Sequence, residues 1–141
     1  METPKFHALL AALEQILRNE PAVLIGSAPL AVLGLRDVND LDVLVKPNTV
    51  EILAARGATE YDSYSAAFVL PVGTIQITSQ LYNLAANCGL TEAQVWQRAD
   101  MWQSWQVWNI QHCKTFKATV RREKDVDDLL LIERHLGRTK T

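Results

Sequence analysis

The sequence has little that would mark a zinc-binding, disulfide-bonded or highly charged protein. It contains two cysteines in 141 residues, Cys88 and Cys113, with no CxxC motif and no histidine or cysteine partners at zinc-ligand spacing. We therefore expect two buried free thiols in a reducing cytoplasm. The net charge of −2 gives no overall basic field, so contact with nucleic acid would need a local basic patch, for which a solvated helix face is the simpler interpretation. The residues that supply such a patch are Lys114, Lys117, Arg121, Arg122 and Lys124.

Long apolar runs are also missing from the chain. A membrane-spanning helix needs about 20 consecutive apolar residues, and no segment approaches that length. Near the N-terminus, Phe6, Leu9 and Leu13 recur at helical spacing, but Glu14 and Arg18 interrupt the run and no small-residue cleavage site follows. This pattern is typical of an amphipathic helix and not of a signal peptide. We expect a cytoplasmic protein that does not associate with membranes.

The composition that is present indicates one folded domain. Hydrophobic residues make up 48% of the chain and charged residues 21%, which is enough for a sizeable core and too apolar for disorder. No internal repeat, low-complexity tract or linker divides the sequence. We expect a single domain over residues 1–141.

Periodicity and turn residues predict an α/β (α+β) fold with a small mixed β-sheet of four or five strands flanked by helices. The last helix is expected to turn Val126, Leu129, Leu130 and Ile132 inward and to end before Gly137. A helix over 50–56 is expected to be capped by Asn48 or Thr49. The predicted helices are one ending near 19–21, then 28–33, 50–56, 81–86, 91–99, one following Asn109, and 125–136. The predicted strands are 23–25, 41–45, 66–70, 74–78 and 105–108.

Two carboxylates open one of the predicted strands. Because strand side chains alternate, Asp40 and Asp42 project from one face while Leu41 points to the other. Two carboxylates on one face are suited to a divalent metal ion such as Mg²⁺, although the pair alone is also typical of a polar turn. The preceding strand ends in Gly26 and Ser27, where a glycine allows close backbone approach and the amides of the next helix can bind phosphate oxygens.

A second group of polar residues lies near the C-terminus. Lys117 is eight residues before Asp125, on a helix for which Asn109 is the expected cap, and it could meet a triphosphate as a point charge while Asp125 orients it or the nucleotide. The alternative is a basic helix packed beside an acidic one. Asp128 shares a helix face with Asp125 and is expected to tie the last helix to the basic one.

The two groups in this order resemble the DNA polymerase β-like nucleotidyltransferase superfamily. Residues 26–42 look like its small AbiEii-like branch, and residues 117–129 are similar to that branch's closing motif, a helical lysine followed by Lys-Asp-x-x-Asp-hydrophobic. The resemblance covers about residues 22 to 135. It implies Mg²⁺-dependent transfer of a nucleoside monophosphate from an NTP to a hydroxyl of RNA, protein or a small molecule, with one or two Mg²⁺ ions. Relatives in this branch act as toxins paired with antitoxins, so an antitoxin or a homodimer is an expected partner.

The resemblance also implies a role for each matching residue. Asp40 and Asp42 would be the metal ligands and, with Lys117, the catalytic residues. Gly26, Ser27, Lys117 and Asp125 would bind the nucleotide. Arg36 matches the Gly-x-Arg element and would either brace the aspartate loop or touch phosphate, and Asp128 would support the site.

One position departs from the resembled pattern. The superfamily's third carboxylate lies on a later strand, and the matching strand 74–78 has Gln76 there. Glutamine can coordinate a metal through its carbonyl but brings no negative charge and cannot act as a base. Asp62 is another acid nearby, but we expect it in a loop.

Gln76 therefore leaves open whether the chain is an enzyme. A nucleotidyltransferase is the first hypothesis. The second is a catalytically degenerate module of the same fold that binds a nucleotide. The third is a protein-interaction scaffold in which a tryptophan-rich segment forms the interface, although core packing is the simpler role for such residues. The tryptophans of this segment are Trp96, Trp102, Trp105 and Trp108.

Overall fold

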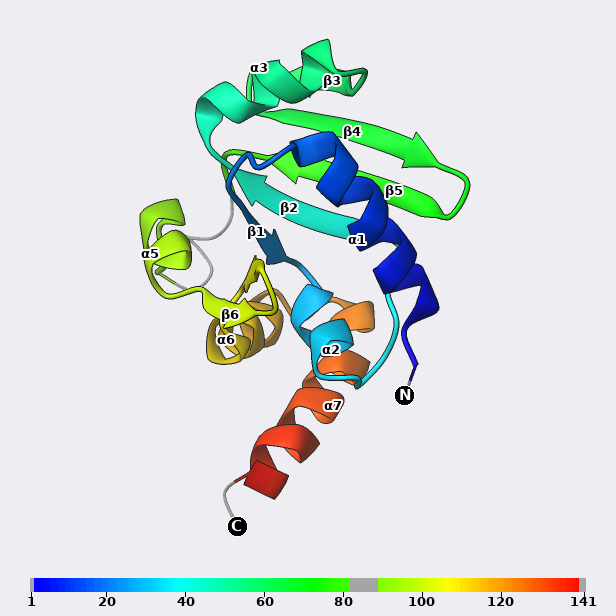
Figure 1. Ribbon diagram of the computed structural model, residues 1–141. Coiled ribbons are helices and arrows are strands. Elements are labelled where there is room, and N and C mark those ends of the chain that lie inside the picture. Colours follow the sequence, from blue (N-terminus) through cyan, green and yellow to red (C-terminus); the bar gives the residue numbers. More distant parts are fainter. Residues whose placement is uncertain (1, 82–88, 140–141) are drawn as a thin grey trace.

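A seven-stranded mixed sheet forms the centre of the computed structural model, which describes residues 2–81 and 89–139 (Figure 1). The strands are β1 (Ala22–Ile25), β2 (Leu41–Val45), β3 (Thr59–Asp62), β4 (Ser65–Leu70), β5 (Gly73–Thr78), β6 (Asp100–Trp102) and β7 (Trp105–Val107). Their order across the sheet is β3-β4-β5-β2-β1-β7-β6. The mixed sheet flanked by helices confirms the predicted fold class, but the expected four or five strands were too few. Both added strands, β3 and β6, lie at the edges, where short exposed segments give no clear alternating pattern.

Helices cover both faces of the sheet. They are α1 (Pro4–Leu17), α2 (Ala28–Val32), α3 (Pro47–Ala55), α5 (Glu92–Gln97), α6 (Ile110–Val120) and α7 (Glu123–Thr139). The helix expected over 81–86 lies almost entirely outside the described residues. In the described part of the chain, no helix is long and apolar enough to cross a membrane.

The core consists of two apolar layers, one on each face of the sheet. On one face, residues such as Leu24 and Val43 pack with Phe6 and Leu13 of α1, the helix that crosses the front of the sheet in Figure 1. On the other face, Val23, Ile25 and Leu44 pack with buried residues of α5, α6 and α7. Because strand side chains alternate, Asp42 of β2 shares the face of Leu44, the one that α6 and α7 cover.

Strand register brings the candidate polar residues side by side. β2 pairs with β1 in antiparallel orientation, with Asp42 opposite Ile25. β2 also pairs with β5 in parallel orientation, with Asp42 opposite Gln76. The predicted hairpin over 71–73 joins β4 to β5.

Some helix ends follow the predicted signals and others do not. The capping box at Thr91 is formed in both directions with Gln94, and the Asn109 side chain caps α6. The expected cap of α3 was wrong, because this helix begins at Pro47, whose fixed φ suits a first turn, so Asn48 and Thr49 are already helical. Likewise, α7 continues through Gly137.

The inward face of α7 also differs from the predicted one. Val126 is 42% exposed and Leu130 is 47% exposed, whereas Leu129 and Ile132 are buried as expected. The side of α7 that packs inward carries two acids together with these apolar residues, because basic residues of neighbouring segments hold those acids. The buried set is Asp125, Asp128, Leu129 and Ile132.

Candidate functional site

The two carboxylates of the acidic pair, Asp40 and Asp42, lie at the start of β2. Asp40 is exposed, and its Oδ1 accepts a hydrogen bond from the backbone amide of Thr74 at 2.9 Å. Asp42 is half-buried and accepts no hydrogen bond from any other residue that the structure describes. Three of the four carboxylate oxygens in the pair are therefore free of protein donors, and oxygens of this kind bind divalent cations such as Mg²⁺.

The loop that leads into the acidic pair is anchored on the start of α1. The carboxylate of Asp37 accepts hydrogen bonds from the backbone amides of Lys5, Phe6 and Val38, each at 2.9 Å. Amides at the start of a helix lack partners within the helix, and a carboxylate there also interacts favourably with the helix dipole. Asp37 thus fixes the loop from which Asp40 emerges.

Electrostatics at Asp42 favour the neutral form of the acid. Burial and, to a smaller extent, the neighbouring charge of Asp40 raise the pKa of Asp42 above its usual value. Lys124, Lys117 and Arg122 act in the opposite direction but do not cancel these effects. A cation bound between the two carboxylates would relieve the same repulsion.

Gly26 is required by the approach of the β1 end to Asp42. Its φ is +64°, and a Cβ atom added there would collide with Oδ2 of Asp42. Any other residue would both strain this turn and displace the acid. The glycine that was predicted for phosphate binding is thus the residue that leaves space for the Asp42 carboxylate.

Gln76 lies where the sequence predicts it, beside Asp42 on the adjacent parallel strand. The described residues contain no group of three His, Cys, Asp or Glu side chains that could hold a metal ion. Asp62 does not supply the missing acid. It belongs to β3 and not to a loop as expected, two strands away from β5, and its Oδ1 accepts from the Tyr64 amide and the Ser65 hydroxyl.

A buried ionic cluster lies next to the acidic pair and connects α2, α6 and α7. Asp128, 3% exposed, accepts hydrogen bonds from Arg36 Nε at 2.6 Å, Arg36 Nη2 at 2.8 Å and Lys117 Nζ at 3.0 Å. Arg36 also donates to the backbone carbonyl of Asp37 at 2.7 Å. Of the two roles considered for Arg36, its contacts therefore favour bracing the aspartate loop. We call Ser27, Arg36, Lys117, Asp125 and Asp128 the ionic cluster.

Lys117 is fully engaged within this cluster. It is 4% exposed, and its ammonium group lies 3.0 Å from Asp128 Oδ2, 3.2 Å from Ser27 Oγ and 3.4 Å from Asp125 Oδ1. An ammonium group has three donors, and here each has an acceptor. The expected triphosphate contact of Lys117 would require breaking one of these bonds.

Asp125 and Asp128 are held in the ionised form. Burial alone would raise the pKa of each acid, but hydrogen bonds from Arg122 to Asp125 and from Arg36 and Lys117 to Asp128 outweigh it and keep both pKa values below the usual range. The predicted tie between α7 and the basic helix is present as the contact of Asp128 with Lys117.

A cleft of about 230 Å³ opens between the acidic pair and the basic residues of α6 and α7. Arg122 and Lys124 line it and were not predicted as site residues. The signal that could have found them is their position one and three residues before Asp125, at and just before the start of α7. The cleft is lined by Gly26, Ser27, Arg36, Val38, Asn39, Asp40, Asp42, Trp108, Phe116, Lys117, Arg122 and Lys124.

The tryptophans contribute mainly to packing. Trp108 is buried and its ring contacts Phe116 edge-on, with ring centroids 5.6 Å apart. Trp102 and Trp105 pack against the layer that contains α1. Cys113 is a buried free thiol, and burial raises its pKa to about 12; Cys88 lies outside the described residues.

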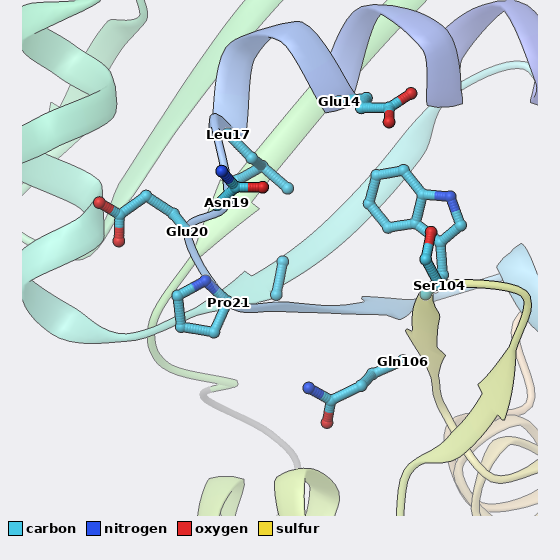
Figure 2. Close-up of a pocket in the computed structure, with 9 residues that line it drawn as sticks. Glu14, Leu17, Asn19, Glu20, Pro21, Ser104 and Gln106 are labelled. Atoms are coloured by element: carbon cyan, nitrogen blue, oxygen red, sulfur yellow. The ribbon is translucent and has the colours of Figure 1, made fainter.

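A second cavity, of about 280 Å³, lies where the end of α1 and the start of β1 meet the β6–β7 hairpin (Figure 2). Glu14 and Glu20 are its charged residues, and Ser104 and Gln106 line it from the hairpin side. None of the residues predicted for the site belongs to it. The second cavity lies beside Ala22, the first residue of β1. The cleft with the acidic pair lies at the other end of this strand, next to Gly26.

This sheet, with an acid pair at the start of β2 and helices on both faces, is a nucleotidyltransferase fold. The solved structure of a Thermotoga maritima protein described as "a putative nucleotidyltransferase (TM1012)" is similar over 98% of this chain and 96% of that chain, with a TM-score of 0.58 and 14% sequence identity. Neither a protein-family model nor a curated protein matches the sequence. At this identity the likeness establishes the fold.

Proposed function

We propose that the protein is a Mg²⁺-dependent nucleotidyltransferase that moves a nucleoside monophosphate from an NTP to a hydroxyl group. The observation that carries the proposal is the cleft itself, in which two carboxylates with free oxygens face basic side chains on a nucleotidyltransferase fold. Carboxylates for a metal ion on one side and cations for phosphates on the other are what phosphoryl transfer requires.

The donor set fits a divalent cation. Mg²⁺ is commonly bound through one or two carboxylates together with substrate phosphates and water, and Asp40 and Asp42 provide two carboxylates, three of whose four oxygens lack protein donors. The amide carbonyl of Gln76, in register with Asp42 on the neighbouring strand, would add a third oxygen-bearing group to the two carboxylates. Bound there, Mg²⁺ would neutralise charge that develops on the phosphates during transfer.

The chain's own residues would bind and orient the nucleotide. A phosphate would approach the backbone at Gly26, which carries no side chain, and the amide of Ser27 in the same turn. The hydroxyl of Ser27 is already engaged by Arg36 at 2.8 Å and Lys117 at 3.2 Å, so its part would be to keep this turn in place. Lys117 and Asp125 would hold α6 and α7 at the distance that leaves the cleft open.

The resemblance of residues 26–42 and 117–129 to the AbiEii-like branch supports a finer proposal. A toxin-like transferase of this branch would use RNA, a protein or a small molecule as acceptor, and an antitoxin or a second copy of the chain as partner.

A second function is favoured by one specific observation. Gln76 occupies the position beside Asp42, and no third acid joins the pair among the described residues. A protein with this site could bind an NTP without turnover, because glutamine cannot act as a base and adds no negative charge. The alternative is therefore a degenerate nucleotidyltransferase module that binds a nucleotide or another protein.

Calorimetric titration of ATP, GTP, CTP and UTP, with Mg²⁺ and with EDTA, tests the proposal. We expect Mg²⁺-dependent binding that is lost in Asp40→Asn/Asp42→Asn and retained in a charge-matched control, Glu60→Gln/Asp127→Asn, at exposed positions. Absence of binding by the folded wild type would reject a nucleotide site. Binding without pyrophosphate release across RNA, protein and small-molecule acceptors would favour the degenerate module.

A further inference from the structure

We propose that Lys124 is the side chain that contacts the phosphates of the NTP, and that Lys117, the lysine which the sequence pattern favours, belongs to the fold. The inference rests on the proposed function and deepens it, because it assigns the phosphate subsite of the cleft to a residue outside the ionic cluster.

The other basic side chains of the cleft are committed to acids. Arg36 uses Nε and Nη2 on Asp128, and Nη1 on a backbone carbonyl. Lys117 has an acceptor for each of its three donors. Arg122 binds Asp125 through Nε at 2.8 Å and Nη2 at 3.2 Å.

Lys124 is the exception among the basic residues that line the cleft. Its side chain is exposed and forms no hydrogen bond or ion pair with any residue in the described part of the chain. It nevertheless lines the same cleft as Asp40 and Asp42, so its positive charge lies across that cleft from the acidic pair. It therefore lies on the cleft that would hold a metal-bound triphosphate.

The backbone at Lys124 is held in place by the neighbouring residue, whereas its side chain is exposed. The next residue, Asp125, is fully buried and held by both Lys117 and Arg122. The ionic cluster thus fixes the backbone position of Lys124, and an exposed ammonium group with three unused donors is left to meet phosphate oxygens. Charge-assisted hydrogen bonds to phosphate are about twice as strong as neutral ones.

The test compares Lys124→Gln with Lys114→Gln, a lysine on α6 that does not line the cleft. Both variants lose one positive charge and keep a polar side chain, so a general effect of charge would appear in both. We expect Lys124→Gln to bind the NTP preferred by the wild type at least tenfold more weakly, about 1.4 kcal/mol, with an unchanged melting temperature. Lys124→Arg should restore most of the affinity, and Lys114→Gln should bind like the wild type.

A second measurement separates phosphate contact from base contact. Inorganic tripolyphosphate with Mg²⁺ should show the same loss in Lys124→Gln, and the dependence of its affinity on salt should become weaker. Wild-type affinity in Lys124→Gln would overturn the assignment of Lys124 while leaving the proposed function intact. Absence of NTP binding by the wild type itself would overturn both.

Discussion

Replacing Asp128 by asparagine should destabilise the protein strongly. Asparagine has nearly the same shape, so the substitution removes charge without creating a cavity. Asp128 is buried and accepts from Arg36 and Lys117, and the carboxamide that replaces it cannot accept with both oxygen positions. A buried lysine would then keep Asp125 as its acidic partner, 3.4 Å away.

The size of the effect follows from the contacts. Removing one partner of a buried ion pair costs about 3–5 kcal/mol. The lower end applies here because Lys117 retains Asp125, and Arg36 retains the carbonyl of Asp37. We expect a loss of about 3 kcal/mol in the free energy of unfolding, which at roughly 3 °C per kcal/mol for a chain of this size lowers the melting temperature by about 9 °C.

Urea unfolding followed by tryptophan fluorescence and by far-ultraviolet circular dichroism measures this loss. Asp127→Asn is the matched control, since its position is adjacent, exposed and on the same helix. The control should stay within about 0.5 kcal/mol of the wild type. A loss below about 1 kcal/mol in Asp128→Asn would refute the view that the ionic cluster fixes α7 against α6.

The dependence on pH provides an independent check of the same cluster. The pKa of Asp128 is lower in the folded protein than its ordinary value of 3.8, so the unfolded chain takes up the proton first as the pH falls. The stability that the charge contributes is thus complete above about pH 4 and is lost as the pH falls through the folded pKa. The difference in melting temperature between wild type and Asp128→Asn should be equal at pH 7 and pH 5 and smaller at pH 3.

Three further substitutions probe the acidic pair. Gly26→Ala should cost about 2 kcal/mol or more in urea unfolding, because φ is +64° and the added Cβ meets the Asp42 carboxylate; wild-type stability would contradict this. Asp42→Asn should raise the melting temperature at pH 7, since burial and Asp40 raise the folded pKa and thus disfavour the charged form. This gain in melting temperature should vanish below about pH 4. A lower melting temperature of Asp42→Asn at pH 7 would contradict the view that the charged form of Asp42 is unfavourable in the folded protein. Gln76→Glu should tighten Mn²⁺ binding several-fold in calorimetry by adding a third carboxylate beside Asp42, and unchanged binding would mean that Gln76 does not face the metal position.

The local signals of the sequence predicted much of the fold. The apolar run before the Lys46-Pro47-Asn48 turn predicted β2 with its limits, Leu41–Val45, and the turn over 71–73 predicted the hairpin of β4 and β5. Capping residues located α5 and α6, because a cap acts on amides only two or three positions away. The edge strands β3 and β6 were missed, since a strand that is paired on one side and exposed has no periodicity of its own.

For α7, local pattern was a poor guide to the buried face. Hydrophobicity favoured Val126 and Leu130 as inward residues, yet both are exposed, at 42% and 47%. The helix is rotated so that Asp125 and Asp128 point inward, toward Lys117 and Arg36, which lie on other segments. A carboxylate is buried only where such partners exist, and the sequence does not show which distant residues will be near.

By itself, the sequence predicted the fold class, the strand that Asp40 precedes and Asp42 belongs to, the glycine turn at the end of β1 and the strand that carries Gln76, because each depends on short-range geometry. Only the tertiary structure decided how the basic residues divide their roles. Lys117 and Lys124 are seven residues apart in the same basic stretch, and nothing local separates them. Burial does, since the ionic cluster encloses Lys117 with three acceptors and leaves Lys124 at the open side of the cleft.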